Sequence, residues 1–167
     1  VTTKSAKDTL VAFFTETMRQ HGDHKKAFQA QTVALDRNAK VQDAPNPKIL
    51  ALVDAADVGT VQKLVDFAAL FEKVATDTYL LGLTMLADAA TKALLAGAMA
   101  VEAQHVAGLR AVGALLKANA PQLVNVPFPA TDLAKLPGAV GNVGFPDSLE
   151  KVNGADLIAE PTSGAVR

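Results

Sequence analysis

The sequence predicts an all-α protein, a helical bundle followed by an extended tail, and two observations support this. Up to residue 120 the chain is rich in Ala, Leu and charged helix-forming residues, and its only prolines there are Pro45 and Pro47. Beyond that point Pro or Gly recurs every few residues, which excludes long helices. We therefore expect residues 1–120 to form the bundle and residues 121–167 to form a tail that packs on the bundle or on a partner.

Three stretches of the predicted bundle share one helical pattern. In each, the residues expected to face the core recur in alternating steps of four and three, which is the spacing of a bundle-facing side. The pattern predicts long helices over about Ser5–Leu35, Thr60–Leu86 and Asp88–Asn119. Asp88 is a suitable N-cap for the last of them because its carboxylate can accept from free backbone N–H groups.

The connection between the first two long helices carries its own signal. Asn46 followed by Pro47 is a good cap and first-turn pair, so a short helix over Lys48–Ala55 is expected. The connection is long enough to return along the bundle, so the first two long helices could run parallel with a crossover between them. The last two are joined by a few residues only, which suits an antiparallel hairpin.

Charge and composition exclude several classes of function. Lys and Arg (16) nearly balance Asp and Glu (17), so no basic field exists and nucleic acid is not an expected partner. The chain has no cysteine, which excludes disulfides, thiolate metal sites and Cys nucleophiles. No apolar run is long enough to predict a transmembrane segment.

Five residues that can bind a metal fall on the predicted bundle-facing sides. His21 and His24 lie on the first long helix, Glu72 lies on the second, and Glu102 and His105 lie on the third. Residues at i and i+3 share one helical face, so each pair can point at a common centre. A single polar residue in a helical core is more often satisfied by a hydrogen bond alone, and this is what we expect for Tyr79. Five such residues on three helices instead predict a metal site, because clustered core carboxylates and imidazoles need each other or a metal.

These motifs resemble those of a known family. The Glu-x-x-His of "AVEAQHVAGLRAVGALL", the Glu within "DFAALFEKVATDTYLLGL" and the stretch "TMRQHGDHKKAFQAQ" are similar to bacterial ferritin-like domain proteins, especially an actinobacterial group. The resemblance implies a four-helix bundle with one long crossover, with one Glu on each of two helices and Glu-x-x-His on the other two. It also implies two bound iron or manganese ions.

The chain departs from this family pattern in two ways. The family's first helix is not found, so we expect a fourth helix from an upstream segment, a partner chain or a homo-oligomer mate. His21 stands where the family has the Glu of Glu-x-x-His, while His24 matches the family histidine. Fewer carboxylates suit one ion, or an altered two-metal site, better than a full dinuclear centre, and the ion would be Fe, Mn or Zn. The resemblance further implies an extracytoplasmic or cell-envelope location, with the cytoplasm as the alternative.

Two functions therefore remain open at the level of sequence. The first is a ferritin-like metal protein with redox or oxygen chemistry or a role in metal handling, whose ligands are His21, His24, Glu72, Glu102 and His105, with Tyr79 beside them. The second is a non-catalytic scaffold or envelope protein that has a degenerate site and acts through protein contacts. In the second case Phe128 and Phe145, each next to a proline in the tail, would bind the partner.

Overall fold

Three long helices and one short helix make up the fold in the computed structural model, which describes residues 4–41, 43–121 and 149. In the described part of the chain there is no strand, so the prediction of an all-α bundle is confirmed. The helices are α1 (Lys4–Leu35), α2 (Pro47–Asp54), α3 (Val61–Met85) and α4 (Ala89–Lys117). Most of the predicted tail, including Phe128 and Phe145, lies outside the described residues.

Side-chain caps set the start of three helices. Asn46 accepts a hydrogen bond from the backbone of Lys48 before α2, and Pro47 takes the first turn of that helix. Thr60 accepts from Lys63 before α3. Asp88 accepts from Thr91 before α4, as its position predicted. Each of these caps satisfies a backbone donor that a helix start leaves free.

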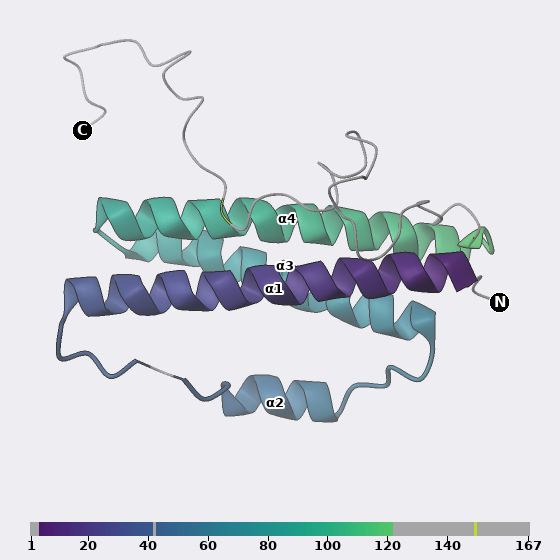
Figure 1. Cartoon of the computed structure of the whole chain (residues 1–167), viewed down its shortest axis with the longest axis horizontal. Coiled ribbons are helices and arrows are strands. Elements are labelled where there is room, and N and C mark those ends of the chain that lie inside the picture. The colour runs from purple at the N-terminus through teal and green to yellow at the C-terminus, as the bar shows by residue number, and fades with distance from the viewer. Residues whose placement is uncertain (1–3, 42, 122–148, 150–167) are drawn as a thin grey trace, which may run out of the picture.

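The long helices lie side by side, and their directions follow from their connections (Figure 1). α1 and α3 run the same way, and α4 runs opposite to both. Residues 36–60, which contain α2, return along the length of the bundle, and this is the crossover that the length of the segment allowed. Residues 86–88 join α3 to α4 as a hairpin.

The apolar core joins one residue from each long helix. Leu10 of α1, Val65 of α3 and Leu109 of α4 are buried against one another, and partly buried apolar residues surround them. Near the hairpin, Gly82 of α3 lies so close to Leu95 of α4 that a Cβ at this position would be 3.0 Å from the Leu95 side chain. The core therefore packs α1, α3 and α4 against one another, and buried polar residues lie among the apolar ones.

Large apolar side chains also remain exposed on two of the long helices. α1 exposes Val11, Met18, Val33 and Leu35, and α3 exposes Leu64, Leu70, Val74, Leu80, Leu81 and Met85. In α2 no residue is buried. None of the described helices is both long and apolar enough to cross a membrane.

Replacement of Leu109 by Ala should lower the free energy of unfolding by about 2–5 kcal/mol, because the side chain is 1% exposed and its loss leaves a cavity. Leu86→Ala is the matched control: this leucine in the loop after α3 is 41% exposed, and its loss should change stability by about 0.5 kcal/mol or less. Urea denaturation followed by helical circular dichroism measures both. Equal effects of the two variants would contradict the placement of the core.

Candidate metal centre

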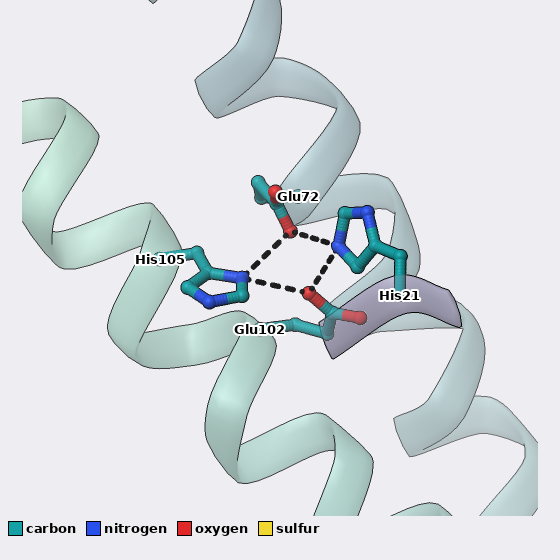
Figure 2. A group of neighbouring side chains, drawn as sticks. All are labelled: His21, Glu72, Glu102 and His105. Atoms are coloured by element: carbon teal, nitrogen blue, oxygen red, sulfur yellow. Dashed lines mark hydrogen bonds and ion pairs between the residues drawn. The ribbon is translucent and has the colours of Figure 1, made fainter. Parts of the chain in front are cut away.

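The middle of the bundle brings together four of the five predicted ligands. His21 comes from α1, Glu72 from α3, and Glu102 and His105 from α4, and one nitrogen or oxygen atom of each lies within 4.8 Å of the others. Figure 2 shows these four side chains converging, with contacts that close a ring in which imidazoles and carboxylates alternate. The i, i+3 spacing of Glu102 and His105 places both on the face of α4 that meets the other helices.

Glu102 is the most heavily contacted member of the group. Its side chain is almost fully buried, and its Oε2 lies 3.1 Å from Nε2 of His21 and 3.1 Å from Nδ1 of His105. Its other oxygen, Oε1, lies 3.0 Å from Nδ1 of His24. One carboxylate of α4 is therefore held by both histidines of α1 and by the histidine one turn along its own helix.

Glu72 faces the same point but is held less closely. Its Oε2 lies 3.5 Å from Nε2 of His21 and 3.4 Å from Nδ1 of His105, which are ion-pair distances. This buried oxygen has no hydrogen-bond partner among the described residues. Burial of an oxygen acceptor without a partner is unfavourable, so the geometry fits a cation bound between the four side chains.

The two histidines of α1 occupy different places. His21, whose side chain is 46% exposed, points its Nε2 into the group. His24 is buried and contacts the outer oxygen of Glu102 instead. Both were predicted as ligands. The structure brings His21 into the central group, and a direct role of His24 in binding metal stays a prediction.

Gln20 is a buried polar contact of the centre that the sequence pattern did not single out. Its side chain is fully buried, and its Oε1 lies 2.7 Å from Nε2 of His105. Gln20 precedes His21 and lies one turn before His24, so it flanks the predicted bundle-facing side of α1. This position could have indicated that Gln20 is buried near the centre, but a neutral amide is not among the usual metal ligands.

Interactions among the side chains shift the pKa values of three members of the group, His21, His105 and Glu102. Burial opposes protonation of His21, but its contacts with Glu102 and Glu72 outweigh burial and raise its pKa to about 10. The same balance raises the pKa of His105. Burial works against ionisation of Glu102, yet its hydrogen bonds to the three histidines hold its pKa far below the usual range. Without a metal, protonated imidazoles therefore balance the carboxylate charge.

A cavity of about 300 Å³ lies beside the centre. His21, His24 and Glu102 border it on the side of the centre, and its other lining residues are Lys25, Phe28, Ala75 and Tyr79. Tyr79 stacks on Phe28 with ring centroids 5.5 Å apart. Burial and the nearby charges of Glu102 and Glu72 raise the pKa of Tyr79 to about 12, so its hydroxyl stays neutral. Tyr79 thus borders the cavity next to the predicted ligands.

Comparison with known protein families identifies the fold of most of the chain. A family model described as a ferritin-like domain matches residues 1–114, which include all four helices except the last residues of α4. Neither a curated protein nor a solved structure gives a significant match.

Raising the pH from about 6.5 to 10 should lower the melting temperature of the protein after chelation of metal. The pKa of His21 is about 10 in the fold, whereas that of an unfolded His is about 6.5. Its protonation therefore stabilises the fold fully below the lower value, and this contribution is lost as the pH rises through the higher one.

His21→Gln is the control for this experiment, since it removes the titrating ring of His21 and should reduce the pH dependence to the part that comes from His105. Calorimetry at several pH values measures both proteins. A melting temperature that stays constant over this pH range in the unsubstituted protein would contradict the ion pairs of His21 with the two carboxylates.

Proposed function

The chain belongs to the ferritin-like domain family, and from this premise we propose that it is a metal-binding protein whose centre holds one transition-metal ion. The observation that carries the proposal is the buried Oε2 of Glu72, which faces His21 and His105 without a hydrogen bond. A cation between the four side chains would give this oxygen the partner that it lacks.

Charge supports a single ion. Two carboxylates, from Glu72 and Glu102, neutralise one divalent ion, whereas two divalent ions would leave two positive charges in a buried site. The remaining donors, on His21 and His105, are imidazole nitrogens. Two nitrogens and two carboxylate oxygens suit Zn, Fe or Mn, which all accept such mixed sets.

The chain's own residues would prepare the ion for chemistry. Iron or manganese would supply redox and oxygen chemistry at this position, and zinc would supply Lewis-acid chemistry. His24 holds the outer oxygen of Glu102, so that the inner oxygen stays directed at the centre. The cavity bordered by His21 and Tyr79 gives a small molecule room beside the ion. These features favour redox or oxygen chemistry or metal handling over purely structural binding.

Elemental analysis should find about one transition-metal ion per chain, as expected for a single four-donor site. Glu102→Gln should remove most of that metal, because it keeps the shape of the side chain and removes its charge at the most contacted position. Glu16→Gln on α1 is the matched control, since Glu16 pairs with Arg19 and lies outside the group, and it should leave the metal content unchanged.

Two outcomes would contradict this proposal. Unchanged metal in Glu102→Gln would exclude the group as the binding site. Two tightly bound ions per chain would overturn the single ion and restore the two-metal centre that the resemblance implies.

A second function, a scaffold that acts through protein contacts, is favoured by the exposed apolar side chains of α2. Ile49, Leu50, Leu52 and Val53 are all exposed, although the helix is mostly apolar. The exposed apolar residues of α1 and α3 support the related proposal that a further helix, from an upstream segment, a partner or a second copy, covers the bundle. From the resemblance stated in the sequence analysis, we further propose an extracytoplasmic or envelope location.

Association of the chain tests the contact function. If α2 takes part in a contact between copies, light scattering after size exclusion should detect a dimer, and Leu52→Glu should convert it to a monomer with unchanged metal content. Lys48→Gln, on the same exposed helix, changes the net charge by the same amount as Leu52→Glu, so it is the charge-matched control and should remain dimeric. A monomer in every case would contradict a contact between copies through α2.

A further inference from the structure

We propose that Gln20 is a positioning residue that fixes the tautomer of His105 and keeps the Nδ1 lone pair of that ring available to a metal. This inference rests on the proposed metal centre and assigns a role to a residue that is not itself a ligand.

The contact between Gln20 and His105 determines where the ring proton lies. Oε1 of Gln20 is a carbonyl oxygen and can only accept, and it lies 2.7 Å from Nε2 of His105. Nε2 must therefore carry hydrogen and donate to it. In a neutral imidazole only one nitrogen carries hydrogen, so the other, Nδ1, has a free lone pair.

That lone pair faces two oxygen atoms. Nδ1 lies 3.1 Å from Oε2 of Glu102 and 3.4 Å from Oε2 of Glu72. Three acceptors at these distances repel one another unless a positive charge lies between them. A proton can supply that charge, and so can a metal ion. By accepting hydrogen from Nε2, Gln20 leaves the position between Nδ1 and the two carboxylates open to a metal ion. If only Nδ1 carried hydrogen, it would donate to the carboxylates and occupy that position.

The surroundings keep this arrangement from relaxing. Gln20 and His105 are 0% and 1% exposed, so water does not compete for either group. Phe13 of α1 contacts the His105 ring edge to face, with centroids 5.8 Å apart and planes at 79°. Phe13 and Gln20 of α1 therefore both contact the ring, which restricts its rotation about the side-chain bonds.

The same turn of α1 thus has two tasks. His21 points into the centre (Figure 2). Gln20 and His24, one helical turn apart, contact the outer atoms of His105 and Glu102. If Gln20 only filled space in the core, metal binding would depend on the volume of its side chain and not on its hydrogen-bond acceptor.

Two substitutions separate these possibilities. Gln20→Met keeps most of the volume and removes the acceptor, and Gln20→Glu keeps an acceptor at the same length. A positioning role predicts that Gln20→Met weakens Zn²⁺ binding by about 10- to 100-fold, and that Gln20→Glu retains most of the affinity. A space-filling role predicts the reverse order, because Met is tolerated in a core and a buried carboxylate is not.

The affinities are measured by competition with a chromophoric Zn²⁺ chelator, with helical circular dichroism as the check on folding. Gln31→Met is the matched control: Gln31 also joins α1 to α4, through Asp88 and Thr91, but lies away from the centre. It should leave the affinity unchanged. Equal affinities for Gln20→Met and the unsubstituted protein would overturn the inference.

A spectroscopic measurement on the unsubstituted protein decides the tautomer directly. In the Zn²⁺-loaded protein, long-range ¹H–¹⁵N correlation should show hydrogen on Nε2 of His105 and metal on Nδ1. Hydrogen on Nδ1 would overturn the inference even if Gln20→Met fails to fold. Failure of the proposed function looks different: the unsubstituted protein would then bind no Zn²⁺ at this group, and the inference would fall with it.

Discussion

The rest of the structure is organised around the burial of two carboxylates in a helical core. Glu72 and Glu102 lie on adjacent helices where a bundle would ordinarily place apolar residues, and an uncompensated charge there costs several kcal/mol. α1 supplies most of the compensation, because His21 and His24 both reach Glu102. The polar centre therefore determines how α1 is seated on the α3–α4 hairpin, and the apolar contacts of Leu10 and Phe13 support that seating on one side of it.

Much of the fold could be predicted because its determinants are local. Asn46, Thr60 and Asp88 are caps in the structure, at or beside the predicted helix starts, and caps depend on a few neighbouring residues only. The crossover followed from the length of residues 36–60, and the hairpin followed from the shortness of residues 86–88. The i, i+3 spacing also placed Glu102 and His105 on one face, since this relation is set within a single helix.

The parts of the site that come from α1 could not be predicted in the same way. They depend on the rotation of α1 about its own axis, which the spacing of residues along the sequence does not resolve. Residues at i and i+3 differ by about 60° around a helix, so a modest rotation decides whether His21 or His24 enters the centre. Side chains of other helices set that rotation, chiefly Glu102, which binds both rings through different oxygens. Gln20 was not predicted for the same reason: its contact with His105 exists only after α1 has docked.

The two connections of unequal length give the centre an order of assembly. Closing the short loop between α3 and α4 costs little chain entropy, so Glu72, Glu102 and His105 can meet early in folding. α1 reaches them only through the long crossover and brings His21, the one exposed member of the group. The α3–α4 hairpin then carries three of the four side chains of the site, and α1 completes the site with His21 when it docks.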